Sequence, residues 1–276
     1  MTKRKLALVL LAVALPLVVV AASSLAAQAA PTETAKGVFI IRCQFSHSKQ
    51  VDPIVKPGPP GTLSAHMHDF FGNNSTDSFS TYNSMIASTT TCGLKGDKAG
   101  YWAPSLVAPN GTLVKPQAVL VYYRNNPVKY GTTTAFPKDF RMVEGGVGTG
   151  PPVAGWSCDQ QASSMVATPP SCGSLKMVAH VRFPSCWDGK NLDSPTHRTH
   201  VAYAVGSSCP SGYPVKVPEI FLHVRYPNGI SGPAYKLSDG TQMPHMDFWN
   251  TWDQATLEKE VHDCLQAGRN CGELTG

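Results

Sequence analysis

Proline and glycine are spread along most of this chain, and they restrict its fold more than any other feature. The sequence contains 23 Pro and 24 Gly among 276 residues. Because proline removes a backbone donor and clashes inside a helix, long helices are largely excluded. Several runs rich in β-branched and aromatic residues predict strands instead: Val38 to Phe45, Val114 to Arg124, Met177 to Pro184 and Phe221 to Pro227. We therefore expect a mainly β fold, a β-sandwich or jelly-roll with long loops.

One helix is predicted, at the C-terminal end. After Asp253, apolar residues recur at helical spacing through Leu257, Val261 and Cys264, and Gly268 provides a stop. This helix is expected to cover an edge of the sheet. The segment 75–91 is crowded with Ser, Thr and Asn, and it predicts turns and short strands.

The first 29 residues have the pattern of a secretory signal peptide. Three basic residues from Lys3 precede the apolar run Leu6 to Val20, and small residues end at Ala29. The apolar run is short for a bilayer span, which needs about 20 residues, and Pro16 interrupts it. We expect cleavage after Ala29, one secreted domain over 30–276, an extracellular location, no membrane association after cleavage, and a monomer.

Most of the apparent basicity of the chain lies in this leader. The full sequence has 23 Lys+Arg against 18 Asp+Glu, and without residues 1–29 it has 20 against 18. A nucleic-acid partner is therefore not expected, because binding to phosphates needs a strong basic excess.

Eight cysteines follow the leader, and an even number in an oxidising compartment predicts four disulfides. Sequence alone does not choose among the possible pairings. The simplest is sequential: Cys43–Cys92, Cys158–Cys172, Cys186–Cys209 and Cys264–Cys271. No C-x-x-C pair occurs, which disfavours a thiolate zinc site or a redox pair.

Histidine and aspartate gather in three short segments. The stretch from Gly61 to Thr76 contains His66, His68 and Asp69, and the other two segments run from His197 to His200 and from His245 to Asp247. In an extended segment His66 and His68 point to the same side, because strand side chains alternate. We expect the three segments to converge on one site. It would be an acid/base site, or a site for a divalent metal bound by His66, His68, His200 and His245.

Four longer motifs carry a resemblance to a known family. They are S-A-H-M-H-D-F-F-G-N (64–73), F-P-S-C-W-D-G-K-N-L-D (183–193), H-R-T-H-V-A-Y (197–203) and H-M-D-F-W-N-T-W (245–252). The chain, from about Val38 to Cys264, resembles a family of secreted fungal and actinobacterial proteins catalogued as domain of unknown function nineteen-ninety-six. Members often sit beside carbohydrate-binding modules, so the resemblance implies a polysaccharide or cell-wall glycan as partner.

Together these features predict a secreted enzyme that cleaves polysaccharide with a His/Asp site. Glycosidic bonds need an acid on the leaving oxygen and a base or nucleophile opposite it. The predicted catalytic residues are His68, Asp69, His200, Asp247 and Asp188, and the predicted substrate-binding residues are Trp249, Trp187, Arg182 and Tyr203. A hydrolase and a lyase both remain open. For Asp188 a plain turn role is an equal alternative, since W-D-G-K-N is favourable turn chemistry.

The alternative is a non-catalytic carbohydrate- or metal-binding protein of the cell wall. Its five tryptophans would stack on sugar rings, although core packing is the commoner fate of tryptophan. An H-E-x-x-H helix, a G-x-S-x-G elbow and the nucleotide-binding fingerprints are all absent from the sequence. A copper site built on an N-terminal histidine is disfavoured too, because the expected mature chain begins at Ala30.

Two of the predicted strands share the pattern H-V-R-aromatic-P. Within each strand its histidine and arginine fall on one face, His180 with Arg182 and His223 with Arg225. These side chains would line a polar groove or form an ordinary solvated sheet face, and the sequence favours the solvated face.

Overall fold

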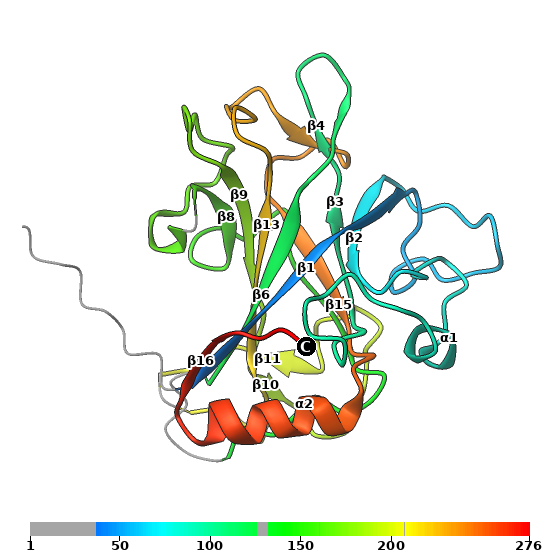
Figure 1. The fold of residues 1–276 in the computed structure, drawn as a ribbon, viewed down its shortest axis with the longest axis vertical. Coiled ribbons are helices and arrows are strands. Elements are labelled where there is room, and N and C mark those ends of the chain that lie inside the picture. Colours follow the sequence, from blue (N-terminus) through cyan, green and yellow to red (C-terminus); the bar gives the residue numbers. More distant parts are fainter. Residues whose placement is uncertain (1–36, 126–131, 160, 207) are drawn as a thin grey trace, which may run out of the picture. The chain divides into compact units, whose positions relative to one another are not determined.

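A computed structural model describes residues 37–125, 132–159, 161–206 and 208–276. Its main element is a ten-stranded sheet with the order β7-β15-β3-β2-β1-β6-β13-β9-β8, and β16 pairs with the start of β1 (Figure 1). The strands are β1 (Val38–Lys49), β2 (His68–Gly72), β3 (Gly100–Pro104), β6 (Ala118–Arg124), β7 (Arg141–Gly145), β8 (Ala154–Cys158), β9 (Met177–Arg182), β13 (Glu219–Arg225), β15 (His245–Trp249) and β16 (Asn270–Glu273).

Two small sheets extend the loops. One has the order β11 (Val201–Ala202), β10 (Cys186–Trp187), β12 (Val215–Lys216). The other has the order β14 (Lys236–Leu237), β4 (Leu106–Val107), β5 (Leu113–Val114). The mainly β prediction is confirmed.

Strand β1 joins the two halves of the main sheet. Its first residues pair with β6 from Val38 to Gln44, and its last ones pair with β2 from Phe45 to Lys49, with a register shift between Phe45 and His47. This long strand lets the sheet curl until it is nearly closed, and both halves then face one core. That core contains inward side chains of both halves, among them Phe39, Ile41, Phe71, Tyr101, Val121, Val181, Leu222 and Phe248.

The predicted C-terminal helix is present and packs on this core. Helix α2 (Gln254–Glu260) continues as a π-helical stretch, Val261–Gln266, and Figure 1 shows it lying across one end of the sheet. Asp253 caps its start by accepting a hydrogen bond from the Thr256 backbone N–H. Its apolar face is buried in the core.

The segment 75–91 contains a helix that the sequence did not predict. Helix α1 (Tyr82–Ile86) begins at a capping box, in which Thr81 and Ser84 satisfy each other's backbone N–H groups. The prediction of turns and short strands was therefore wrong for these residues. A short 3-10 turn, η1 (Ala162–Ser164), also occurs.

All four disulfides form in the sequential pairing. They pin the loops as expected, and the described chain has no free cysteine. In the parts of the chain that the structure describes, no helix is long and apolar enough to cross a membrane. The predicted signal peptide, residues 1–29, lies outside the described residues.

Candidate metal centre

The outer face of β2, β3, β15 and β7 presents an apolar patch with polar groups at one end. Across these strands Phe70, Trp102, Asp247 and Val143 lie in register on one face. A second buried apolar cluster consists of Val51, Ile54, Phe70, Met85, Trp102, Val143 and Trp249. Because β strands alternate, His68 shares this outer face with Phe70. The polar groups therefore pack against buried apolar side chains that exclude water.

Three histidines meet at the end of this patch. The rings of His66 and His68 have centroids 4.3 Å apart, and the ring of His245 lies 5.2 Å from the first and 6.0 Å from the second. One nitrogen from each of the three rings falls within 4.8 Å of the other two. The cluster joins two segments almost 180 residues apart in the sequence, because β2 and β15 both pair with β3.

The orientation of His68 is fixed by the backbone. Its Nδ1–H donates to the Val51 carbonyl at 2.9 Å, so Nε2 carries the lone pair. The Nε2 atoms of His66 and His68 are both buried and have no hydrogen-bond partner among the described residues. Asp239 lies 3.5 Å from Nδ1 of His245. A carboxylate behind a histidine orients the ring and raises its basicity as a metal ligand.

Two buried carboxylates adjoin His68. Asp52 accepts the backbone N–H groups of Ile54 and Val55 on Oδ1, while its Oδ2 lies 3.8 Å from Nε2 of His68. Asp247 is fully buried, and neither of its oxygens has a hydrogen-bond partner in the described chain. Ligand atoms of Asp52, His68 and Asp247 also lie within 4.8 Å of one another.

Burial controls the electrostatics of this cluster. It lowers the pKa of His66 and, more strongly, of His68, with a further lowering from neighbouring histidines. Burial also raises the pKa of Asp52, against two backbone hydrogen bonds that lower it. Burial raises the pKa of Asp247 well above its usual range, and the charge of Asp52 adds a smaller raising effect. Neutral imidazoles are the ligand form of histidine, and an unpartnered buried carboxylate is stabilised by a cation.

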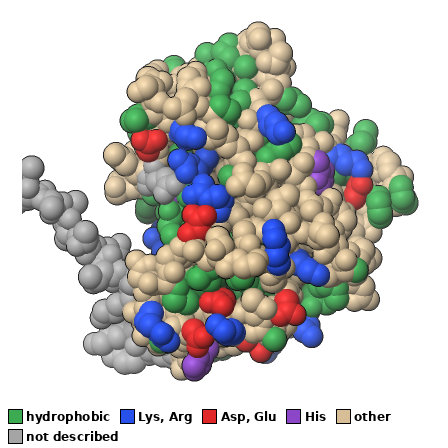
Figure 2. Space-filling model, in the orientation of Figure 1, with side chains coloured by type: hydrophobic (Ala, Val, Ile, Leu, Met, Phe, Trp, Pro, Cys, Tyr) green, Lys and Arg blue, Asp and Glu red, His purple; other side chains and the backbone are tan. Residues whose placement is uncertain are grey.

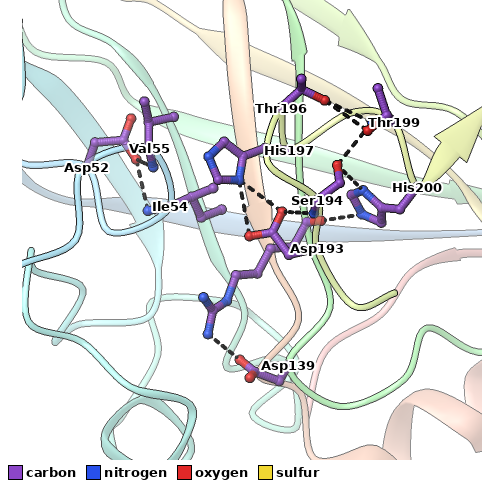
Figure 3. A network of polar contacts seen from close by, with 11 residues as sticks. Asp52, Ile54, Val55, Asp139, Asp193, Ser194, Thr196, His197, Thr199 and His200 are labelled. Carbon is purple, nitrogen blue, oxygen red and sulfur yellow. Dashed lines mark hydrogen bonds and ion pairs between the residues drawn. The ribbon is translucent and has the colours of Figure 1, made fainter. Parts of the chain in front are cut away.

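The segment 193–198 borders the site. The backbone N–H of Val143 in β7 donates to the His197 carbonyl at 3.0 Å, which attaches the segment to the edge of the sheet. The His197 Nδ1–H donates to both oxygens of Asp193, at 2.9 and 3.1 Å. His197 lies near enough to Asp52 to lower the pKa of that carboxyl, against the larger raising effect of burial. Figure 3 shows the His197 ring between Asp52 and Asp193.

These groups fit a divalent transition metal. Three imidazoles with nearby carboxylates form a donor set that zinc and similar ions use in proteins. The unpartnered nitrogens and the unpartnered carboxylate all lie in one place. The two groups of possible ligands share His68, and a cation bound in either group would compensate buried atoms that have no partner in the described chain. The assignment depends on this observation.

The structure brings together four of the residues predicted from sequence. His66 and His245 form one group of possible ligands with His68, and Asp247 forms a second group with His68 and Asp52. His200, the fourth predicted metal ligand, is in neither group. Its Nε2–H donates to the Arg141 carbonyl of β7 at 2.7 Å and its Nδ1 accepts from Ser194, so both nitrogens already have partners.

Asp69 points to the opposite face of β2 from His68. Its Oδ1 accepts hydrogen bonds from Ser48 at 2.6 Å and Ser105 at 2.7 Å, and burial raises its pKa to about 6. Asp188 is partly exposed and accepts the backbone N–H groups of Lys190 and Asn191. That geometry matches the turn alternative for Asp188.

The predicted substrate-binding residues lie outside the cluster. Trp249 is 1% exposed, donates to Asp139 and lies beneath the Arg141 guanidinium, so its ring faces are covered. The partly exposed Trp187 donates to the Asn191 carbonyl.

Arg182 and Tyr203 pack on each other. The guanidinium of Arg182 lies 5.5 Å from the centre of the Tyr203 ring, and the Tyr203 hydroxyl donates to the Arg182 carbonyl. Their predicted contact with substrate stays a prediction.

Sequence reasoning did not find Asp52, Asp239 or the pair of His197 with Asp193. Asp52 stands in a proline-rich loop and Asp239 in a turn before Gly240, where an aspartate is ordinary turn chemistry. The sequence does single out the two members of the pair separately, His197 in one of the three polar segments and Asp193 as a carboxylate at the end of the motif 183–193, but it does not show that they meet.

The fold and this cluster define a class: a disulfide-linked β protein with a buried His/carboxylate centre on the outside of a nearly closed sheet. Within that class, the chain belongs to the family described as Domain of unknown function (DUF1996), which matches residues 52–252. The match contains every residue of the cluster. No curated protein and no solved structure matches the chain.

Proposed function

We propose that this protein is a secreted, metal-dependent enzyme that cleaves polysaccharide, with a divalent transition metal held by His66, His68 and His245. The observation that carries the proposal is the convergence of these three rings with two buried carboxylates, while the Nε2 atoms of His66 and His68 lack partners in the described chain. The glycan substrate is supported by the resemblance of the chain to a family often found beside carbohydrate-binding modules.

A divalent metal bound here would supply a water molecule with a lowered pKa, and hydrolysis needs such a nucleophile at neutral pH. The protein supplies the proton-transfer groups. The His197 side chain is 20% exposed and is oriented by Asp193, so it can accept or return a proton at Nε2. Asp52 is fixed by two backbone N–H groups beside His68. Cleavage of a glycosidic bond uses one such group on each side of the bond.

The positions of the tryptophans favour this enzyme over a binding module built on aromatic stacking. Trp102, Trp156, Trp249 and Trp252 are all buried at 1% exposure or less. Only Trp187 has a partly exposed ring, and its N–H is already bonded. A sugar-binding platform needs exposed ring faces, whereas a metal centre needs the buried donors present here.

The test is the metal content of the purified mature protein. Wild type, His66→Ala, His245→Ala and His200→Ala are loaded with zinc, manganese or copper and dialysed, and bound metal is measured by elemental analysis. We expect about one metal per chain in wild type and in His200→Ala, and loss of the metal in the other two variants. His262→Ala is the matched control, because His262 is exposed and its ring contacts Asp263 on the surface of the C-terminal helix.

Activity is tested on the same samples. Chelated and metal-reloaded wild type are incubated with a panel of neutral and acidic polysaccharides, and products are separated by chromatography. Cleavage that returns with metal and is absent from His66→Ala supports the enzyme. Folded wild type that binds no metal after loading would exclude the metal centre, and stoichiometric metal without cleavage would favour the metal-binding wall protein.

A further inference from the structure

The other half of the main sheet carries a second histidine cluster. His180 in β9 and His223 in β13 are direct cross-strand neighbours, with ring centroids 4.4 Å apart. His180 is 0% exposed and His223 is 4% exposed. The expectation of an ordinary solvated face was therefore wrong for these two residues. Aromatic rings of the same face cover them: the Phe221 and Tyr122 rings lie 4.4 and 4.6 Å from the His223 ring, and the Phe221 ring lies 5.8 Å from that of His180.

This cluster has buried nitrogens without partners. Both ring nitrogens of His223 lack a hydrogen-bond partner among the described residues, as does Nδ1 of His180, whose Nε2 contacts the Ser157 hydroxyl at 2.7 Å. The Nε atoms of Arg182 and Arg225 are also buried and unpartnered. A buried polar group without a partner costs free energy, so a set of them on one face points to a missing acceptor.

This face carries more arginines than acidic side chains, with Glu219 as the register partner of Arg124. The strand registers place Arg42, Arg124, Arg182 and Arg225 on it, and Figure 2 shows Lys and Arg side chains gathered over this half of the sheet. Arg42 pairs with Glu273 and Arg124 with Glu219. Within the described chain, Arg182 and Arg225 form no ion pair.

We propose that this face binds an oxyanion, a carboxylate, sulfate or phosphate group, between His223 and the guanidinium groups of Arg182 and Arg225. The guanidinium fork matches the two oxygens of such a group, and an imidazole N–H provides a further donor. The Tyr122 ring lies 4.6 Å from the His223 ring, which places an aromatic surface beside the anion. An acidic sugar has this combination of charge and ring.

The site is separate from the candidate metal centre. The metal cluster lies on β2 and β15, while these residues belong to β9 and β13, on the other side of β1 in the sheet order. The inference does not rest on the proposed function. It stands on the unpartnered nitrogens and the unpaired guanidinium groups.

Titration calorimetry tests the inference, with sodium glucuronate, sulfate and phosphate as separate probes at constant ionic strength. The protein is chelated first, so that binding to a metal at the other site does not contribute. We expect saturable binding in the millimolar range, and the probe that binds best identifies the oxyanion. Arg225→Gln and Arg182→Gln are each expected to weaken it about tenfold. Lys190→Gln is the control, since it removes the same charge from an exposed loop.

A second readout reports on the histidines themselves. Imidazole nitrogen resonances of His223 should shift on addition of the bound probe, while those of exposed His262 should not. Absence of saturable binding by all three probes would overturn the inference. Equal affinity in wild type, Arg225→Gln and Arg182→Gln would also overturn it, because the attraction would then be nonspecific. Should one arginine variant fail to fold, the other still decides the outcome.

Discussion

At the scale of single residues, the candidate centre depends on what stands behind each histidine. The Val51 carbonyl fixes the tautomer of His68, and Asp239 stands behind His245. Both are contributed by loops and not by the strands that carry the histidines. Such outer groups decide affinity because they remove the freedom of the ring before a metal arrives.

Asp239 is therefore expected to matter although it is not in the cluster of ligands. Burial opposes its ionisation, yet the hydrogen bond with His245 and those from Thr241 bring its pKa down to about 2. Asp239→Asn keeps the shape and removes the charge. We expect it to weaken metal binding by about 10- to 100-fold, measured by competition with a chromogenic chelator.

The matched control for this prediction is Asp263→Asn. Asp263 also contacts a histidine, His262, at 2.8 Å, but on the exposed surface of the C-terminal helix. Unchanged affinity in both variants would mean that Asp239 does not support a ligand.

Local sequence patterns predict part of this centre, and there is a physical reason why they miss the rest. Alternation along an extended chain correctly groups His66 with His68. It also puts Asp247 on the same face of β15 as His245. The same rule sends Asp69 to the other face of β2, where it binds Ser48 and Ser105. His200 shares the composition of the other segments, but its partner is a backbone carbonyl, and no side-chain pattern reveals a carbonyl.

At the scale of elements, the turn after β7 holds β15 in position. Gly145 is the register partner of His245 and has φ of +83°. A Cβ at this position would collide with the backbone oxygen of Pro244, directly before His245. Only glycine lets the two strands approach this closely.

Gly145→Ala should therefore damage both stability and the site. We expect it to lower the free energy of unfolding by about 2 kcal/mol more than Gly148→Ala, measured by denaturant unfolding. Gly148 is the matched control because it has φ of +92° but open space around its Cβ position. Both variants have the strain of a positive φ, and only the first has the clash. Metal affinity should fall in Gly145→Ala alone, and equal effects of the two changes would contradict this account.

Elements whose apolar residues recur at a regular spacing were predictable, while helix α1 was not. The strands with β-branched runs and the helix after Asp253 appear at the expected places. Helix α1 spans only five residues and buries a single side chain, Met85, so it leaves no apolar period to detect. Its capping box alone marks it, and a Ser/Thr-rich segment offers many false examples of that pattern.

At the scale of the whole molecule, strand order decides which residues meet. His68 and His245 converge because β3 lies between β2 and β15. No local signal reports that order, since it follows from closing one sheet around one core. This closure also puts the metal cluster and the arginine face on separate halves of the outer surface.

The same closure buries a polar chain in the core. Asp97 accepts the Tyr101 hydroxyl at 2.8 Å, Tyr101 contacts Tyr123 at 2.7 Å, and the Trp252 N–H donates to Tyr123 at 3.0 Å. These residues connect both halves of the sheet with the segment before helix α2. Burial raises the pKa of Asp97 from 3.8 to about 8, against the lowering effect of its hydrogen bonds.

This shift predicts how stability depends on pH. The folded state holds a proton on Asp97 up to about pH 8, while the unfolded state releases it near pH 3.8. Between these values the folded state binds more protons, so the free energy of unfolding falls as pH rises, by up to about 1.4 kcal/mol per pH unit. Asp97→Asn cannot ionise at this position, so its free energy of unfolding should lack this dependence on pH.

Denaturant unfolding of both proteins at several pH values measures this difference. Subtracting one curve from the other cancels the contribution of Asp69, which both proteins share. Asp263→Asn, on the exposed helix surface, should keep the wild-type slope. If the curves of wild type and Asp97→Asn run parallel from pH 4 to pH 8, Asp97 is ionised in the folded core and the hydrogen bond from Tyr101 outweighs its burial.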